Sequence, residues 1–376
     1  MKKLLTYKRS YLLALMPISL FLILLARKSD FFAEQIFAKH IYKWISQIIS
    51  TVTGIFPFSL AELIVILLPV AVILILLRFI LRMILDKSRR GEILIKGILN
   101  FLCALSVVLF AFVVLGGLNY YRYSFSTYSN LEITESSVDE LYALTESLML
   151  DANELRAQST GEDEDGVFRL TMNHRELGIE AEKAFELLAE DYPILSGRYG
   201  APKPILLSKL MSMTEITGIF FPFTMEANVN VDVPDYSIPV TMLHELAHLR
   251  GFMREDEANY IAYLAGMESD QAELRYSATM LALIISGNAL YDQRPELYFE
   301  ICGQYSEGVV KDLRANSLYW QQYEDTVVST VSNRINDTYL KANAQSDGVQ
   351  SYGRMLDLLL ARYREEQQTS MAAAEE

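Results

Sequence analysis

Residues 240–259 read VTMLHELAHLRGFMREDEAN, and this stretch decides what the rest of the chain is built around. His244 and His248 are four positions apart, so on a helix they lie one turn apart on the same face. Two imidazoles placed in this way can share one zinc ion (Zn²⁺). Glu245 follows the first histidine and is positioned to accept a proton from a zinc-bound water molecule. The spacing therefore predicts a zinc-dependent hydrolase with Glu245 as its general base.

The third zinc ligand is expected to lie beyond Gly251. A glycine three residues after the second histidine predicts a helix end, because glycine readily adopts the left-handed conformation found there. A second helix from about Arg254 can then present an acidic side chain to the same ion. Metzincin peptidases place a third histidine or aspartate ligand where this chain has Arg254. We therefore expect Glu255 to be the third ligand, with Glu257 as the alternative.

Glu255 and Asn259 resemble a second pattern. In gluzincin peptidases, a glutamate from a second helix completes the zinc site, and an Asp or Asn four residues later hydrogen-bonds a ligand histidine. Residues 255–259 read EDEAN and match that pattern, with both end residues on one helix face. The resemblance implies that Glu255 binds zinc and that Asn259 orients a ligand histidine without touching the ion.

The segment before this helix predicts a strand. Residues 226–233 (EANVNVDV) alternate valine with asparagine and aspartate, which is typical of a half-buried strand. Many zinc peptidases pair an extended substrate with an edge strand beside the active-site helix. Asn228 and Asn230 could then contact a peptide substrate, although a plain core strand is the other interpretation. Residues 205–208 also predict a short strand, after the break at residues 200–204.

Three apolar segments predict transmembrane helices at about 11–26, 60–85 and 97–118. Each is close to the roughly 20 residues that a bilayer-spanning helix needs. A signal peptide is the alternative for the first segment. Residues 40–58 predict either an amphipathic helix along the outer membrane surface or an ordinary packed helix. We therefore expect the lipid bilayer to be one partner of this chain.

Charge divides the chain into two regions. Residues 1–121 contain 14 Lys or Arg and 5 Asp or Glu, a net charge of +9, whereas residues 122–376 have 19 and 42, a net charge of −23. The basic N-terminus, with Lys2 and Lys3, and the basic loop 86–96 predict a cytoplasmic location for both. Residues 122–376 would then form an extracytoplasmic domain. Its acidity argues against a nucleic-acid partner, which requires a basic face.

The predicted fold class is an α-helical membrane anchor of three transmembrane helices (residues 1–121), followed by a mainly α (α+β) zincin-like metallopeptidase domain with a small sheet (residues 122–376). Apolar residues at helical spacing predict helices at 138–157 and 171–191, and later at 295–315, 317–343 and 348–368. Ser137 is a suitable cap for the first of them.

The segment 222–266 (PFTMEANVNVDVPDYSIPVTMLHELAHLRGFMREDEANYIAYLAG) resembles a family of bacterial membrane proteins known as domain of unknown function 3810. Its members are similar in having N-terminal transmembrane helices followed by a HELAH-x-RGF-x-RE-DEAN segment. The resemblance extends through most of the chain and implies the architecture, but says little about the substrate.

Two functions remain open from the sequence. The first is a membrane-anchored zinc metallopeptidase that hydrolyses peptide or protein substrates at the outer face of the membrane. The alternative is a membrane-anchored zinc-binding sensor or scaffold with little or no turnover. A purely structural zinc site usually has four protein ligands and does not need Glu245, so the intact motif favours the peptidase.

Overall fold

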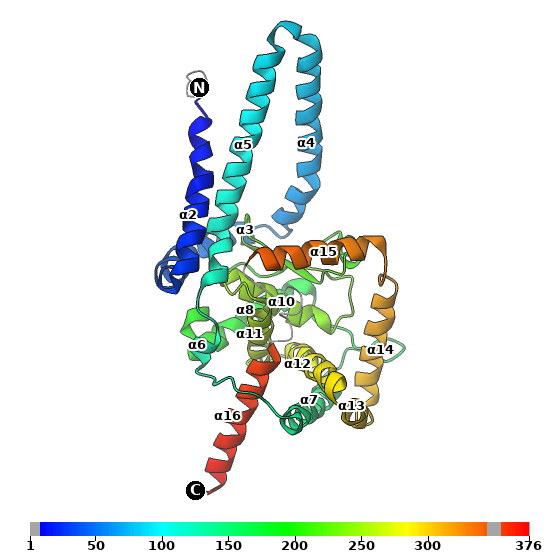
Figure 1. Cartoon of the computed structure of the whole chain (residues 1–376). Coiled ribbons are helices and arrows are strands. Elements are labelled where there is room, and N and C mark those ends of the chain that lie inside the picture. The colour runs from blue at the N-terminus through cyan, green and yellow to red at the C-terminus, as the bar shows by residue number, and fades with distance from the viewer. Residues whose placement is uncertain (1–7, 344–354, 376) are drawn as a thin grey trace.

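Three long apolar helices extend from one side of a helical domain (Figure 1). This computed structural model describes residues 8–343 and 355–375. Lys2, Lys3 and the first part of the helix predicted at 348–368 lie outside the described residues. The helical domain comprises residues 29–59, 116–343 and 355–375, so it includes a segment from between the first two apolar helices.

The apolar helices are η1 and α2 (Ser10–Ala14 and Leu15–Lys28), α4 (Leu60–Leu85), and η3 and α5 (Lys87–Arg89 and Arg90–Leu115). Each of the three is long and apolar enough to cross a membrane, as predicted. The third differs from its predicted bounds of 97–118. It ends at Leu115 because Gly116 leaves the helical conformation, and residues 117–121 form the 3₁₀ turn η4 (Gly117–Tyr121).

The helical domain is built from short and medium-length helices. In chain order they are the π-helix η2 (Phe32–Tyr42), α3 (Lys43–Gly54), α6 (Ser126–Ser129), α7 (Val138–Gln158), α8 (His174–Asp191), η5 (Pro193–Leu195), α9 (Ser208–Ser212), α10 (Ser237–Leu249), α11 (Glu255–Met267), α12 (Ala272–Gln293), α13 (Pro295–Cys302), α14 (Glu307–Gln321), α15 (Val327–Ala342) and α16 (Met355–Glu375). The Ser137 cap of α7 is confirmed, as a capping box with Glu140. The helix predicted at 295–315 is divided by a turn after Cys302 into α13 and α14. The helix predicted at 317–343 is interrupted by a turn after Gln321, so that its first residues belong to α14 and the rest forms α15.

The domain contains a small sheet with the strand order β1-β3-β2. Its strands are β1 (Lys203–Pro204), β2 (Gly218–Phe221) and β3 (Glu226–Val229). The strand predicted at 226–233 therefore forms over its first half only, and the strand predicted at 205–208 is wrong. After Ile205 the chain leaves the sheet, because the N–H groups of Leu206 and Leu207 donate to the Glu62 carboxylate in the first turn of α4.

Helix α10 lies at the centre of the domain. It packs against the sheet on one side and against α8, α11 and α12 on the others, and most of its residues are buried. Ala258, Ala262 and Ala265 on α11 are fully buried. These small side chains allow α11 to approach α10 closely. The close contact matters because the predicted zinc ligands are divided between these two helices.

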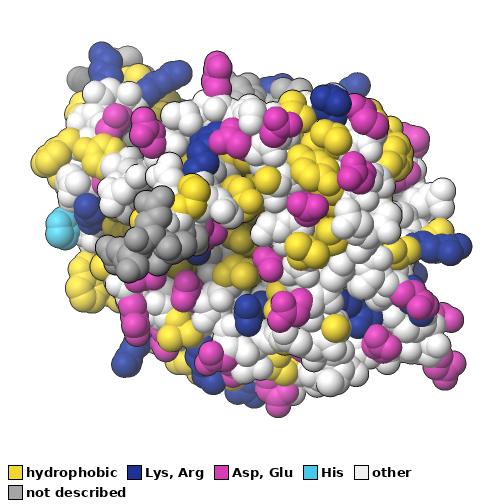
Figure 2. Space-filling model, turned by 90° about the horizontal axis from the view of Figure 1, so that it is seen from below, with side chains coloured by type: hydrophobic (Ala, Val, Ile, Leu, Met, Phe, Trp, Pro, Cys, Tyr) yellow, Lys and Arg dark blue, Asp and Glu magenta, His cyan; other side chains and the backbone are white. Residues whose placement is uncertain are grey.

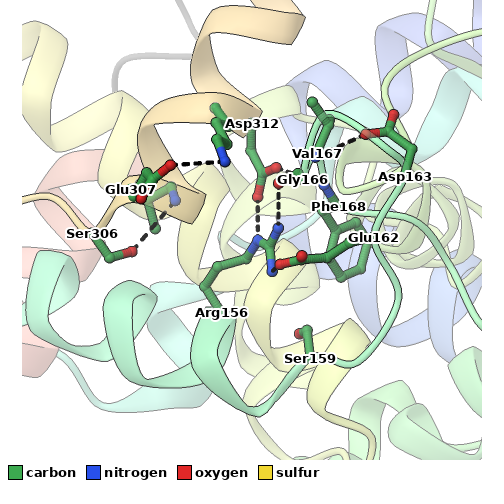
Figure 3. A network of polar contacts seen from close by, with 12 residues as sticks. Arg156, Ser159, Glu162, Asp163, Gly166, Val167, Phe168, Ser306, Glu307 and Asp312 are labelled. Carbon is green, nitrogen blue, oxygen red and sulfur yellow. Dashed lines mark hydrogen bonds and ion pairs between the residues drawn. The ribbon is translucent and has the colours of Figure 1, made fainter.

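A polar network holds α7, α12 and α14 together away from the apolar helices (Figure 3). Asp312 of α14 pairs with Arg156 of α7 at 2.7 Å and also accepts hydrogen bonds from the Phe168 N–H and the Tyr276 hydroxyl. Arg156 donates in turn to Glu162 in the acidic loop 160–166. Two carboxylates in this part of the domain therefore have internal partners that stabilise the fold.

A second buried ion pair joins the domain to the segment between the first two apolar helices. Arg122 donates two hydrogen bonds of 2.9 Å to Glu34 on η2, and both side chains are almost completely buried. A third bond of 3.3 Å reaches the carbonyl oxygen of Arg250, and the guanidinium lies 4.0 Å from the ring centre of Phe252. Residues on both sides of position 121, the predicted boundary between the membrane anchor and the domain, therefore share one core.

Breaking this pair should destabilise the protein strongly. In Glu34→Ala, Arg122 stays buried without its counter-charge, so we expect the free energy of unfolding to fall by about 3–5 kcal/mol. The double variant Glu34→Leu/Arg122→Met should lose less, since no charge is left unpaired. Thermal unfolding in detergent would measure both. The control is Glu92→Ala, which removes two exposed ion pairs and should leave the melting temperature unchanged. Equal stability of Glu34→Ala and Glu92→Ala would contradict the role of the pair.

Candidate metal centre

The turn between α10 and α11 brings the predicted ligands together. Gly251 has φ = +90°, the left-handed conformation predicted for it. Its N–H donates to the His248 carbonyl oxygen at 2.9 Å, and the Phe252 N–H donates to the Ala247 carbonyl oxygen at 3.1 Å. A Cβ at Gly251 would lie 3.0 Å from the Tyr42 ring and 3.2 Å from the Arg122 guanidinium. The chain therefore reverses at a position that favours glycine for two reasons, the positive φ and the lack of space for a Cβ.

His244, His248 and Glu255 form a cluster that could hold a metal ion. Glu255 Oε2 lies 3.2 Å from His244 Nε2 and 3.6 Å from His248 Nε2. Tetrahedral zinc with bonds of about 2.0–2.1 Å places neighbouring ligand atoms about 3.3 Å apart, which is close to both distances. The side chains of His244 and Glu255 are 14% and 13% exposed, so the cluster can be reached from outside.

The other ring nitrogen of each histidine has a hydrogen-bond partner. His244 Nδ1 lies 2.7 Å from Asn259 Oδ1, and His248 Nδ1 lies 2.7 Å from the carbonyl oxygen of Phe252. A carbonyl oxygen can only accept, so the Nδ1 of His248 keeps its proton. In the neutral ring, the free electron pair is then on Nε2 and points toward Glu255. Partners of this kind fix the orientation of metal-binding histidines.

Glu245 lies beside the cluster, against strand β2. It is buried, and its Oε2 has no hydrogen-bond partner among the described residues. A Cβ at Gly218 would lie 2.9 Å from Glu245 Cδ and 2.7 Å from Thr241 Cγ2, so only glycine fits between β2 and α10 without a shift.

Burial and charge shift the pKa values of this cluster in opposite directions. Burial raises the pKa of Glu245, although the two histidines partly counter it. Burial would also raise the pKa of Glu255, but the charge of His248 and hydrogen bonds from both histidines hold that pKa well below its usual range. Burial would lower the pKa of His248, yet Glu255 and Glu245 raise it to about 9. One carboxylate is thus held ionised between the histidines, whereas ionisation of Glu245 is disfavoured.

Glu257, the alternative ligand, lies outside the cluster. Its Oε1 accepts hydrogen bonds from the Phe125 N–H at 3.0 Å and from Arg254 Nη1 at 2.8 Å. Burial raises the pKa of this carboxyl group, although Arg254 counteracts the effect. The Glu257 carboxylate is therefore used to hold the chain after η4 against the first turn of α11.

Asn228 and Asn230 are not placed to contact a substrate. Both side chains are fully buried, and β3 is the central strand with a neighbour on each side. Asn228 Oδ1 accepts a hydrogen bond of 2.6 Å from Ser59, the cap of α4, and Asn230 Nδ2 donates to Ser212 and to the Ile216 carbonyl oxygen. The prediction of a substrate-binding edge at these residues is corrected: they connect the sheet to α4 and to α9.

The edge strand beside Glu245 is β2, which was not predicted from the sequence. The Asn230 N–H donates to the Thr217 carbonyl oxygen at 2.8 Å. Hydrogen-bonded pairs alternate along an antiparallel ladder, so Gly218 and Phe220 direct their backbone groups away from β3. The signal in the sequence was weak, because GIFF is short and does not alternate.

Tyr339 of α15 is a further residue that the sequence did not single out. Its hydroxyl lies 3.2 Å from the Tyr120 hydroxyl, and its ring packs edge-on against Phe112 of α5. Burial raises the pKa of Tyr339, the hydrogen bond with Tyr120 lowers it, and the charge of Glu255 raises it slightly. No local sequence pattern identifies this residue, because its contacts lie more than 200 positions earlier in the chain.

Comparison with known proteins gives one match. Residues 37–360 match the family described as "Protein of unknown function (DUF3810)". No curated protein and no solved structure matches the chain. The matched region covers most of the sequence, including the second half of η2, the sheet, α10, α11 and α15. This chain therefore belongs to the DUF3810 family.

Proposed function

We propose that this protein is a membrane-anchored zinc metallopeptidase. The observation that carries the proposal is the convergence of two imidazole nitrogens and one carboxylate oxygen from α10 and α11, beside the buried carboxylate of Glu245. A structural zinc site would not require this second acidic group.

The donor set fits zinc. His244, His248 and Glu255 supply three ligand atoms of the types that catalytic zinc sites use, with a fourth position left for water or substrate. Asn259 and the Phe252 carbonyl hold the two rings in the orientation that directs Nε2 inward. Zinc bound there would polarise the scissile carbonyl group and lower the pKa of the attacking water.

Glu245 would perform the proton transfers. It is adjacent to the ligand residue His244, and its Oε2 has no competing partner among the described residues. A carboxylate in this position can accept the proton of the attacking water and then pass it to the leaving amine. Burial alone raises the pKa of Glu245, and the positive charge of zinc bound beside it would favour the ionised form that a general base needs.

The edge of β2 is the best candidate for substrate binding. Gly218 and Phe220 direct backbone groups away from β3, at the open edge of the sheet, and Gly218 lies next to Glu245. An extended peptide can add to such an edge by backbone hydrogen bonds, which would place its scissile bond near the cluster. This assignment replaces the one made for β3 from the sequence.

Zinc binding should depend on the three clustered side chains. His244→Ala and His248→Ala should each abolish tight binding, and Glu255→Ala should weaken it more than Glu257→Ala, the matched control on the same helical turn. Asn259→Ala should cost about 10–100-fold in zinc affinity, since it leaves one ring without its partner. Metal analysis with competitive chelator titration measures all five proteins. If Glu257→Ala weakened binding more than Glu255→Ala, the ligand assignment would be wrong.

Glu245→Gln separates a catalyst from a metal-binding scaffold. Glutamine keeps the size of the side chain but cannot act as the base, so peptide hydrolysis should fall at least about 10²-fold while zinc content and melting temperature stay near wild-type values. The assay uses the full chain in detergent or nanodiscs with a peptide library. Wild-type hydrolysis by zinc-loaded Glu245→Gln would exclude the mechanism. A wild-type protein that binds zinc and cleaves no peptide would favour the sensor or scaffold function.

We also propose that α2, α4 and α5 cross the bilayer with the helical domain outside the cytoplasm. Support comes from the basic residues Lys87, Arg89 and Arg90 in the turn between α4 and α5, at the end farthest from the domain (Figure 1).

Cysteine labelling in intact cells tests this topology. In a protein with Cys103 and Cys302 replaced by serine, a membrane-impermeant maleimide should label Glu164→Cys in the domain but not Ser88→Cys in the turn. After the cells are opened, both positions should react. The reverse pattern in intact cells would place the domain in the cytoplasm.

A further inference from the structure

Exposed apolar side chains gather on three segments of the helical domain near the ends of α4 and α5. They are Trp44 and Ile48 on α3, Leu206 and Leu210 beside and within α9, and Val331 and Ile335 on α15, and each is more than half exposed. We call these six residues the apolar belt. Exposed apolar residues that gather on one side of a domain usually mark a surface that binds another apolar body.

Helix α15 shows most clearly which way the belt faces. Ser329 and Leu340 are buried on one side of this helix, whereas Val331 and Ile335 lie on the opposite side, given about 100° per residue. Tyr339 is one turn beyond Ile335, and its ring packs edge-on against Phe112 in the last turns of α5, at 6.2 Å between centres. The apolar face of α15 is therefore turned away from the domain core and toward the side of the apolar helices.

Two contacts fix α15 at that side. Tyr339 contacts α5, and Asn333 Nδ2, on the domain-facing side of the helix, donates to Glu215 Oε2 at 2.7 Å. Glu215 follows α9, and the N–H groups of Leu206 and Leu207 before α9 bind Glu62 in the first turn of α4. Helix α15 lies across the direction of α4 and α5, at the domain side of their ends (Figure 1).

Helix α3 has the same arrangement. Its apolar residues Trp44 and Ile48 are exposed, whereas Ser46 and Ser50 on the other face are buried, and the Ser50 hydroxyl accepts a hydrogen bond from the Gly200 N–H. A helix of a soluble domain normally buries its apolar face and exposes its polar one. The reversed arrangement in α3 requires an apolar environment outside the domain.

The face of the domain farthest from the apolar helices is different. Apolar side chains show on it in patches, and acidic and basic side chains are scattered among them (Figure 2). The apolar belt lies on the side that carries α4, whose most apolar 18 residues have no buried position. This continuity with a helix long enough to cross a bilayer indicates lipid, and not another protein, as the material that covers the belt.

We propose that the apolar belt inserts into the outer headgroup region of the bilayer, with α3 and α15 lying in the plane of the membrane. Amphipathic helices at this depth bury their apolar face about 5–10 Å into the boundary between headgroups and acyl chains. The inference rests on the bilayer crossing proposed above.

Fluorescence quenching tests this proposal. An environment-sensitive fluorophore is attached to single cysteines at Ile335, Leu206, Leu74 and Leu150 in the protein with Cys103 and Cys302 replaced by serine, reconstituted in nanodiscs. Leu74 lies within α4 and reports the crossing, and Leu150 lies on α7, with an exposed fraction of 58% close to the 65% of Ile335. Doxyl-labelled lipid should quench the probes at Ile335, Leu206 and Leu74 several-fold, with blue-shifted emission, and leave the probe at Leu150 unchanged.

The outcomes separate the two proposals. Quenching at Leu74 but not at Ile335 and Leu206 would overturn the docking of the belt and leave the crossing intact. Quenching at none of the positions would overturn both. Blue-shifted emission at Ile335 without lipid quenching would show that protein covers this face, for instance a second copy of the chain, and would also overturn the proposal. None of these readings depends on zinc or on peptidase activity.

Discussion

The buried ion pair between Arg122 and Glu34 is the contact on which the geometry of the candidate metal centre depends. Removing two charges from water costs several kcal/mol for each ion, and parallel charge-assisted hydrogen bonds offset part of that cost. Arg122 also bonds the Arg250 carbonyl oxygen and stacks on Phe252, the two residues on either side of Gly251. The turn that sets the distance from His248 to Glu255 is therefore held by Arg122, which Glu34 of η2 fixes in place. A segment between two apolar helices thus fixes the spacing of ligands that are more than 200 positions away.

The small sheet connects the same centre to α4. Glu226 of β3 accepts hydrogen bonds from the N–H groups of Leu60 and Ala61 at the start of α4, and it pairs with the buried amine of Lys203. A carboxylate at a helix N-terminus is stabilised by the helix dipole and satisfies N–H groups that have no partner within the helix. On its other side β3 pairs with β2, which lies against Glu245. Asn228 is one of the polar residues that the alternating pattern predicts to be exposed. Its side chain is instead buried between β3 and the start of α4, where it accepts the hydrogen bond from Ser59.

The sequence predicts the parts of the structure that depend on neighbouring residues. Helix spacing and the single glycine at 251 predict how α10 and α11 meet, and Ser137 predicts the start of α7, because these effects act within a few positions. The ion pair of Arg122 joins residues 88 positions apart, and the hydrogen bond from Phe125 that occupies Glu257 joins residues 132 positions apart. No local pattern contains such pairings. Strand β2 and the true length of β3 were missed for the same reason, since only pairing with distant residues defines a strand of four residues.

The attachment of α4 to the sheet has a mechanical consequence. This helix has 26 residues, which is longer than the roughly 20 that a bilayer core needs, so a spanning α4 would tilt to match the local thickness of the lipid. The start of α4 is hydrogen-bonded to β3 through Ser59 and Glu226. Strand β3 in turn pairs with β2, which lies beside Glu245. Tilt of α4 and position of β2 are then not independent. A bilayer of different thickness would change the tilt of α4 and thereby shift the strand that borders Glu245. Lipid chain length would then affect the position of β2 as well as the surroundings of the apolar helices.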